Sequence, residues 1–300
     1  MEKPYLLHFA TPGTRVSPFD VNMAYDAGWN AVIPYSGVGL EDIAGFTQDA
    51  IFSRGPKGVK HTGIFIGGRD PMLAAGMLDA ARKAMVPPFE VSVFADPSGA
   101  FTTAAAMIAA VEKALTSTHG STLAGRRVTV FGGTGPVGMI AAVLAAQAGA
   151  EVTIPGHDGL FRAQSAAEAI QARFGVTIRP IDASSDDAKA ALIADTEVAL
   201  ATAKAGVQVM GPAHLAHAAR LLVAADINAV PPAGIEGIGV MDDGKPLVAA
   251  SGHAVGIGPL AIGNIKYKVQ QGLLQAMLRT DSPLYLGFAD CLREARLHAA

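Results

Sequence analysis

A short run rich in glycine, Gly133-Thr134-Gly135-Pro136-Val137-Gly138, constrains the fold of this chain more than any other feature. An apolar, strand-like segment at residues 126–131 precedes the run, a helix-like segment at 136–148 overlaps its end, and a second strand-like segment follows at 151–154. In this context such glycines permit a tight turn, close approach of the backbone to a pyrophosphate, and close packing of helix on strand. The run therefore predicts a parallel α/β sheet that binds a dinucleotide. A βα turn without a ligand is the alternative.

The rest of the chain alternates short apolar runs with helical patterns, which is typical of parallel strands joined by crossover helices. In the N-terminal part, strands are expected at residues 5–9, 31–35, 63–67 and 90–94, and helices at 18–28, 40–50, 71–86 and 102–116. Further on, strands are expected at 176–178, 198–202 and 222–226, and helices at 160–173 and 266–278. We therefore expect two α/β domains. Residues 1–110 form the first, with 270–300 packing back on it, and residues 111–269 form a Rossmann-like, doubly wound parallel sheet.

Composition narrows the class of function. Half of the 300 residues are hydrophobic, 16% are charged and the formal net charge is −3, so neither a nucleic-acid partner nor a membrane partner is expected. The single cysteine, Cys291, excludes an internal disulfide, and no His, Asp or Glu spacing indicates a metal site. We expect a cytoplasmic protein that needs no metal.

The choice of cofactor depends on Gly156-His157-Asp158, at the end of the second strand after the glycines. An acid about 20 residues beyond the glycine turn usually binds the adenosine ribose 2′-hydroxyl of NAD, and Asp158 lies at that distance. An Arg would suit the 2′-phosphate of NADP, and this chain has His157 instead. Asp158 is equally suited to capping the next helix, so use of either NAD or NADP is expected.

Several further segments match a known family in order along nearly the whole chain. They include Ser17 to Asn22, Gln48 to Arg54, Thr62 to Gly68, Phe94 to Gly99 with Thr102-Thr103, Asp226 to Ile235, and Gly256 to Lys266. With these segments the chain resembles the NAD(P)-dependent methylenetetrahydromethanopterin dehydrogenases of methylotrophic bacteria. The strictly NADP-dependent relatives carry Gly-Arg where this chain has Gly156-His157, which resembles the branch that accepts both cofactors.

The resemblance implies an oxidoreductase that moves a hydride from methylenetetrahydromethanopterin to NAD(P)⁺ in one-carbon (formaldehyde) oxidation, and it implies a homo-oligomer. Two other functions stay open. One is a methylenetetrahydrofolate dehydrogenase or another NAD(P)-dependent dehydrogenase, although the Tyr-x-x-x-Lys of folate dehydrogenase–cyclohydrolases is missing: Gln271 stands where Tyr267 would require the Lys. The other is a nucleotide-sensing protein without catalytic activity.

Candidate site residues fall into two groups. For the substrate, the matching segments indicate Asp20, Asp96, Ser98, Thr102 and Thr103, although helix capping explains any one of them equally well. Lys266 is the candidate catalytic residue: it is expected at the opening of a helix, where a cation is electrostatically disfavoured, and the resemblance places it beside cofactor and substrate. The cofactor site comprises the glycine run with Gly156, His157, Asp158, Thr202, Asn228 and Gly256.

Overall fold

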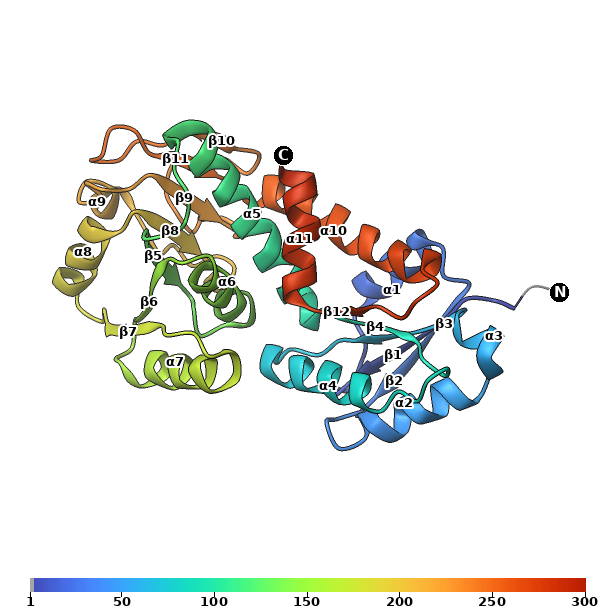
Figure 1. The fold of residues 1–300 in the computed structure, drawn as a ribbon. Helices are drawn as coiled ribbons and strands as arrows, with labels where there is room; N and C mark the ends of the chain where they lie inside the picture. Colours follow the sequence, from blue (N-terminus) through green and yellow to red (C-terminus); the bar gives the residue numbers. More distant parts are fainter. Residues whose placement is uncertain (1–2) are drawn as a thin grey trace. The chain divides into compact units, whose positions relative to one another are not determined.

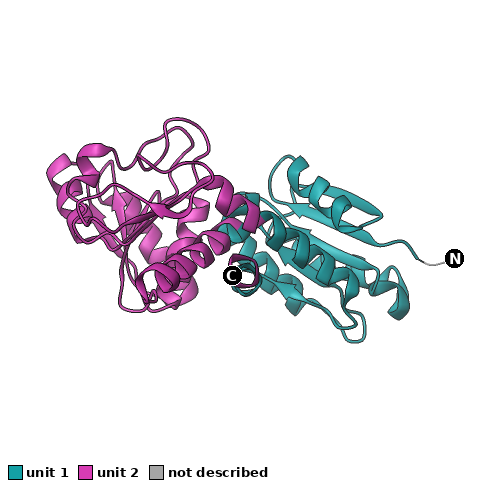
Figure 2. Ribbon diagram, turned by 90° about the horizontal axis from the view of Figure 1, so that it is seen from above, with its two compact units in different colours: residues 1–102, 267–295 teal, residues 103–266, 296–300 magenta. Residues whose placement is uncertain are grey.

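The computed structural model describes residues 3–300, which divide into two compact units (Figure 2). Unit 1 contains the described residues up to Thr102 together with Tyr267–Ala295, and unit 2 contains Thr103–Lys266 with Arg296–Ala300. The chain passes from unit 1 to unit 2 within helix α5 (Ala100–His119) and returns within α10 (Pro259–Arg279).

Unit 1 is built on a five-stranded parallel sheet in the order β12-β4-β3-β1-β2 (Figure 1). Its strands are β1 (Leu6–Thr11), β2 (Ala31–Ser36), β3 (Thr62–Ile66), β4 (Ser92–Ala95) and β12 (Tyr285–Leu286). Its other helices are α1 (Pro18–Ala27), α2 (Ile43–Phe52), α3 (Gly55–Val59), α4 (Pro71–Lys83), the short 3₁₀ helix η1 (Pro97–Gly99) and most of α11 (Phe288–Ala299). Because the strand order reverses between β1 and β3, their carboxyl ends form a switch point where open α/β sheets bind ligands.

A ladder of aromatic rings holds this sheet together. Phe9 on β1 lies opposite Phe65 on β3, which lies opposite Phe94 on β4. The ring centroids are 4.7 Å and 5.3 Å apart in edge-to-face arrangements, and all three side chains are buried. Edge-to-face pairs add to the gain from burying apolar area, so this ladder fixes the register of the three central strands.

Unit 2 is built on a seven-stranded sheet in the order β10-β11-β9-β8-β5-β6-β7. Its strands are β5 (Arg127–Phe131), β6 (Glu151–Gly156), β7 (Arg179–Asp182), β8 (Val198–Ala201), β9 (Val223–Asp226), β10 (Asp243–Pro246) and β11 (Val255–Ile257), and only β10 is antiparallel to its neighbour. Its own helices are α6 (Pro136–Gln147), α7 (Phe161–Phe174), α8 (Asp186–Asp195) and α9 (Pro212–Leu215). Because the order reverses between β5 and β8, the six parallel strands form the doubly wound Rossmann sheet, which confirms the predicted fold class.

Two predicted elements are wrong in their bounds. The strand expected at 176–178 forms three residues later, as β7, because Gly175 ends α7 in the left-handed conformation (φ 69°) and residues 175–178 carry no regular structure. The helix expected at 266–278 begins at Pro259, which follows Gly258 and suits a first helical position. Lys266 therefore lies in the third turn of α10, and the argument from an unfavourable helix N-terminus does not apply to it.

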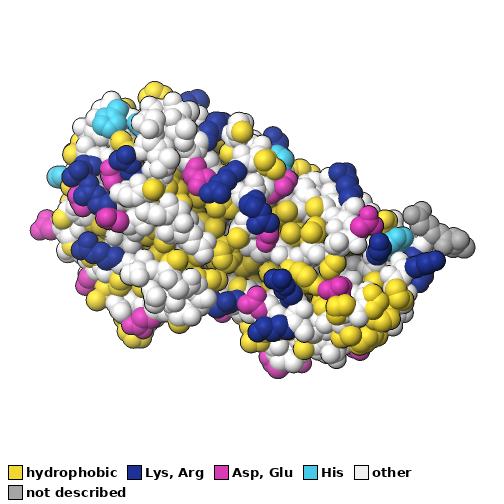
Figure 3. Space-filling view, in the orientation of Figure 1, with side chains coloured by type: hydrophobic (Ala, Val, Ile, Leu, Met, Phe, Trp, Pro, Cys, Tyr) yellow, Lys and Arg dark blue, Asp and Glu magenta, His cyan; other side chains and the backbone are white. Residues whose placement is uncertain are grey.

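The charged side chains on the face seen in Figure 3 do not gather into one dominant patch. In Figure 3, Lys and Arg side chains are scattered among acidic and uncharged ones on that face. Within residues 3–300, none of the helices combines the length and apolar character that spanning a membrane requires.

Candidate functional site

The glycine run forms a tight turn between the carboxyl end of β5 and the first turn of α6, at the switch point of the unit 2 sheet. Gly132 has φ 80°, a conformation that favours glycine, and its carbonyl accepts a hydrogen bond of 2.9 Å from Gly135 N–H. The turn therefore reverses the chain within four residues and places the N-terminus of α6 beside the end of the strand.

The glycines of the turn differ in what surrounds them. A Cβ at Gly133 would lie 2.6 Å from Ile154, and one at Gly138 would lie 2.4 Å from the carbonyl oxygen of Gly132. Gly133 and Gly138 are thus required by packing within the protein. At Gly135 a Cβ would meet only the Gly132 carbonyl oxygen, at 3.3 Å, and the backbone is extended (φ −88°, ψ 166°). The space beside Gly135 is therefore open to a ligand.

The first turn of α6 supplies the donors for such a ligand. Pro136 at the first helical position has no N–H, and Met139 N–H donates to Gly135 O at 2.9 Å. The N–H groups of Val137 and Gly138, which precede the first intrahelical bond, point past the helix N-terminus together with the positive end of its dipole. This is the arrangement that binds a pyrophosphate.

The segment predicted to read the adenosine ribose lies on the neighbouring strand, at the end of β6. Gly156 is closely packed, since a Cβ there would lie 2.0 Å from the carbonyl oxygen of Gly159. The side chains of His157 and Asp158 are 84% and 46% exposed, so both are available to a ligand. Asp158 Oδ2 accepts a hydrogen bond of 3.3 Å from Arg162 in the first turn of α7, a residue that sequence reasoning missed.

Thr202 lies on the other side of the turn and supports it. It directly follows β8, is 8% exposed, and its hydroxyl donates to Phe131 O at 2.8 Å. The same hydroxyl oxygen would lie 2.5 Å from a Cβ at Gly138. Thr202 therefore holds the glycine turn in place, and the structure brings the turn, Thr202 and the Gly156–Asp158 segment to one edge of the sheet.

Asn228 and Gly256 lie further along the same sheet and have clear packing roles. The Asn228 side chain accepts from Gly206 N–H at 3.1 Å and Val230 N–H at 3.0 Å, and donates to Pro232 O at 2.8 Å, so it shapes its own loop. Gly256 is buried within β11, where a Cβ would meet Ile238 at 3.0 Å. It lies in the middle of this short strand.

A buried carboxylate, Asp226, organises the loop that contains Asn228. It is fully buried and accepts backbone N–H bonds from Asn228 (2.8 Å), Gly234 (2.7 Å) and Ile235 (3.2 Å). A Cβ at Gly234 would lie 2.6 Å from its Oδ1, which explains the glycine there. Burial raises the pKa of the Asp226 carboxyl above its ordinary value, and the three N–H donors oppose that shift.

We expect Asp226→Asn to lower the free energy of unfolding by about 2–4 kcal/mol, because an amide NH₂ in place of one oxygen faces backbone donors. Urea unfolding of the variant beside Asp49→Asn, an exposed carboxylate on α2, measures the effect. The control should stay within about 0.5 kcal/mol of the parent. Equal losses in the two variants would contradict the role given to Asp226.

The contribution of Asp226 to the free energy of unfolding depends on pH because the pKa of its carboxyl is raised. Because the folded chain then holds this proton more tightly than the unfolded chain, the Asp226 contribution to stability falls as pH rises from the unfolded-state pKa to the folded-state pKa. The stability gap between the parent and Asp226→Asn should therefore narrow as pH rises through that window.

In unit 1, two predicted substrate residues form a helix cap. Asp96, at the carboxyl end of β4, is fully buried, and its Oδ1 accepts from Phe101 N–H (2.9 Å) and Thr102 N–H (3.2 Å). Its Oδ2 accepts from the Thr102 hydroxyl at 2.7 Å. Asp96 and Thr102 thus close the N-terminus of α5, as the capping alternative expects.

Ser98 and Thr103 lie next to this cap. Ser98 is exposed and is the one described residue other than glycine with a positive φ (51°), and its hydroxyl donates to Gly68 O at 2.7 Å. Such a conformation is uncommon for serine and is often found at ligand sites. Thr103 is partly exposed. The loop therefore presents Ser98 at the edge of the unit 1 sheet, beyond the end of β4.

Asp20 belongs to a buried polar pair that sequence reasoning missed. Asp20 is 4% exposed in the first turn of α1, and its Oδ1 accepts a hydrogen bond of 2.6 Å from Gln270 Nε2. Gln270 is fully buried in α10, one helical turn after the half-buried Lys266. Residues four positions apart share a helix face, so Lys266 lies on the face of α10 that carries Gln270.

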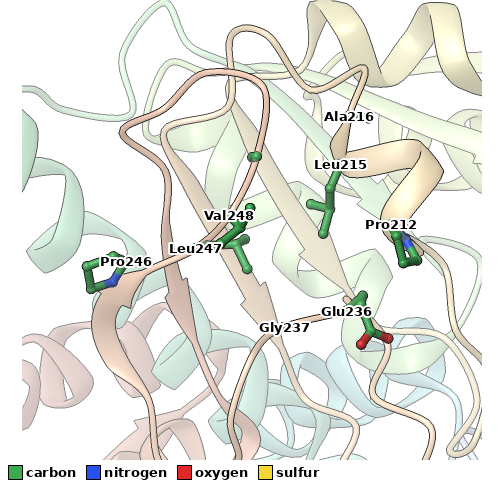
Figure 4. Close-up of a pocket in the computed structure, with 9 residues that line it drawn as sticks. Pro212, Leu215, Ala216, Glu236, Gly237, Pro246, Leu247 and Val248 are labelled. Carbon is green, nitrogen blue, oxygen red and sulfur yellow. The ribbon is translucent and has the colours of Figure 1, made fainter.

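A separate groove in unit 2 contains none of the predicted site residues. It encloses about 300 Å³, and Figure 4 shows Leu215 from α9 on one side and Leu247 with Val248 on the other. Among residues 3–300, no three His, Cys, Asp or Glu side chains come together in a way that suits a metal ion.

Two curated proteins of Methylorubrum extorquens are similar to this chain over almost its full length. The NAD(P)-dependent methylenetetrahydromethanopterin dehydrogenase is 47% identical over 290 residues, 97% of each protein. The bifunctional protein MdtA is 32% identical over 285 residues, 95% of this chain and 96% of that protein.

Solved structures share the fold at low sequence identity. The NAD-dependent malic enzyme of Thermotoga maritima aligns with a TM-score of 0.56 and 12% identity, covering 97% of this chain and 84% of that one. The ligand-free 5-ketofructose reductase of Gluconobacter sp. strain CHM43 aligns with a TM-score of 0.52 and 17% identity, covering 99% and 100%. These likenesses concern the fold alone.

A family model described as methylene-tetrahydromethanopterin dehydrogenase, N-terminal, matches residues 18–98. Together with the 47% identity over nearly the whole chain, this match confirms the resemblance noted in the sequence. The chain belongs to the methylenetetrahydromethanopterin dehydrogenase family.

Proposed function

We propose that this protein oxidises methylenetetrahydromethanopterin to the methenyl form by transferring a hydride to NAD(P)⁺. The observation that carries the proposal is the 47% identity over 97% of the chain to a dehydrogenase of that name. The open space beside Gly135, at the N-terminus of α6, gives it a physical basis, because that space suits a pyrophosphate.

The reaction explains a site without an obvious acid–base pair. The lone pairs of the two nitrogens that flank the methylene bridge assist the departure of the hydride, and the cation that forms is delocalised over N–C–N. No proton transfer is needed. NAD(P)⁺ supplies the hydride acceptor, and the protein has to hold the two rings in position and shape the local electrostatic field.

The two units divide this work in our proposal. Unit 2 holds the dinucleotide: Gly133 and Gly138 pack the turn, Gly135 leaves room for the pyrophosphate, and Asp158 is available to the adenosine ribose. Thr202 and Asn228 support the turn and the adjacent loop through their backbone contacts. We propose that residues 1–110, with 270–300 packing back on them, form the pterin domain, and we expect the protein to form a homo-oligomer.

Substrate contacts are proposed at the edge where β4 ends. Ser98 is exposed there, and Asp96 and Thr102 fix its loop through the α5 cap, so Ser98 and Thr103 are the direct candidates and the other two act as support. Asp20, held by Gln270, and Lys266 on the same face of α10 as Gln270 form the second group. We propose that Lys266 orients the pterin.

One assay tests the function and separates its alternatives. Purified protein is given methylenetetrahydromethanopterin or methylenetetrahydrofolate, each with NAD⁺ or NADP⁺, and the methenyl product and reduced cofactor are followed together. We expect the highest kcat/KM with the methanopterin carrier and equal amounts of the two products. A higher kcat/KM with the folate would move the assignment to the first alternative, and no turnover with either carrier would favour the nucleotide sensor.

A further inference from the structure

The end of β6 presents two opposite charges to the same ligand position. Asp158 follows the strand, and Arg162 lies one helical turn later in α7. Their side chains are 46% and 58% exposed, and Arg162 Nη1 lies 3.3 Å from Asp158 Oδ2. The pair is therefore formed at the surface, at the edge of the sheet that carries the glycine turn.

The two members of this pair suit different riboses. A carboxylate accepts hydrogen bonds from the 2′-hydroxyl of NAD and repels the 2′-phosphate of NADP. A guanidinium offers five N–H donors in a planar fork that matches a phosphate, whereas the imidazole of His157 offers two at most. A chain with Asp158 alone would favour NAD, so a cation within reach of the same ribose has to offset the repulsion of the phosphate.

We propose that Arg162 is the receptor for the 2′-phosphate of NADP and that its ion pair with Asp158 sets the balance between the two cofactors. This inference rests on the proposed dinucleotide site. With NAD, Arg162 stays on Asp158 Oδ2 and Oδ1 remains available to the ribose. With NADP, the Arg162 guanidinium turns to the 2′-phosphate and neutralises the negative charge that Asp158 repels.

Moving the Arg162 side chain from Asp158 to the 2′-phosphate costs little free energy. An ion pair this exposed contributes little to stability, so leaving Asp158 costs Arg162 little. The position in α7 fixes the Cα of Arg162, while its long side chain keeps several rotatable bonds. Arg162 also lies in the first turn of α7, whose dipole adds positive potential for a phosphate.

The test needs no pterin and uses two isomeric nucleotides: 2′,5′-ADP carries its second phosphate on the 2′-oxygen, whereas ADP carries it in a 5′-pyrophosphate and keeps a free 2′-hydroxyl. Variants are therefore compared for each ligand separately. Binding of 2′,5′-ADP and of ADP is measured by calorimetry for the parent, Arg162→Gln and Arg220→Gln. Arg220 is a matched control: it is also 58% exposed and lies 3.9 Å from an aspartate, Asp195, which ends α8 shortly before β8 begins and hence lies at the opposite edge of the sheet.

For Arg162→Gln we expect 2′,5′-ADP to bind about 10-fold to 100-fold more weakly, the loss typical of a charge-assisted hydrogen bond to phosphate. ADP should keep its affinity or bind up to about fivefold more tightly, since Asp158 is released. Arg220→Gln should match the parent with both ligands. Equal 2′,5′-ADP affinities in the parent and Arg162→Gln would overturn the inference, while failure of the parent to bind either ligand would overturn the dinucleotide site itself.

A second pair of variants tests the coupling of the two charges. Asp158→Asn should strengthen 2′,5′-ADP binding and weaken ADP binding, since it removes the carboxylate. When Asp158→Asn is combined with Arg162→Gln, the gain in 2′,5′-ADP affinity that it causes should differ by at least about threefold from the gain that it causes in the parent. The reason is that substitutions of interacting residues are not additive. An unchanged gain would show that Arg162 does not act on the phosphate together with Asp158.

Discussion

Replacing Lys266 with alanine is expected to lower kcat/KM by on the order of 10²-fold or more, roughly 2.7 kcal/mol of transition-state stabilisation. Lys266 is half-buried in the third turn of α10, on the face that carries Gln270 and its bond to Asp20. In our proposal a cation held there orients the pterin and shapes the field at the bridge nitrogens. Steady-state kinetics with both substrates, beside calorimetric binding of NAD⁺, measures the two effects separately.

The same helix offers a matched control. Lys268, two residues on and exposed, lies on another face of α10, so Lys268→Ala should keep kcat/KM within about threefold, as surface changes usually do. NAD⁺ affinity should survive in Lys266→Ala, because we assign that binding to the glycine turn. Near-full activity of Lys266→Ala would refute the role, and loss of NAD⁺ binding would reassign this lysine to the cofactor.

The pH profile distinguishes orientation from acid–base chemistry. Because hydride departure needs no proton transfer, kcat of the parent should be flat through neutrality. A bell-shaped or sloping profile with a pKa that disappears in Lys266→Ala would make Lys266 a general acid or base instead.

Gly135→Val is expected to weaken NAD⁺ and NADP⁺ binding by on the order of 10²-fold or more while the protein stays folded. The backbone at Gly135 is extended, and a Cβ there would meet only the Gly132 carbonyl oxygen, at 3.3 Å, so a shift of a few tenths of an ångström in the turn accommodates a side chain. The branched side chain would occupy the space in front of the α6 N–H groups, and losing two charge-assisted hydrogen bonds to phosphate suffices for this loss.

Gly138, three residues after Gly135, is expected to give a contrasting result. Gly138→Ala places a Cβ 2.4 Å from Gly132 O and 2.5 Å from the Thr202 hydroxyl, so it should lower thermal stability as well as binding. Gly135→Val should unfold closer to the temperature of the parent than Gly138→Ala does, because its Cβ contact is 3.3 Å. A folded Gly135→Val protein with undiminished NAD⁺ affinity would remove the cofactor from this turn.

Much of the fold could be predicted because its signals are local. The strands of unit 1 are short apolar runs, and α1 and α4 begin at Pro18 and Pro71, where the side chains of the preceding Ser17 and Asp70 cap the helices. Two of the strands that escaped prediction lack an apolar period: β10 is Asp-Gly-Lys-Pro, and β12 has two residues. They become strands only because a neighbouring strand offers its edge.

The site residues also divide into those with a local sequence signal and those without one. The glycine turn and the Gly156–Asp158 segment are linear patterns, and the sheet order brings them together as parallel pairing requires. Gln270 could not be found in this way, because its contact with Asp20 joins residues 250 positions apart and a single glutamine in a helix carries no signal. Lys266 was found through the resemblance, whereas the electrostatic argument for it depended on a helix start that lies seven residues earlier.

Direct hydride transfer is tested most sharply by following a label from the methylene bridge. Methylenetetrahydromethanopterin deuterated at the bridge is incubated with the protein and NAD⁺ or NADP⁺ in ordinary water, and the reduced cofactor is analysed by mass spectrometry. The account predicts that a deuterium moves to the reduced cofactor with none lost to solvent, and that single-turnover rates show a primary isotope effect. Deuterium released into water, with unlabelled NAD(P)H formed, would contradict it.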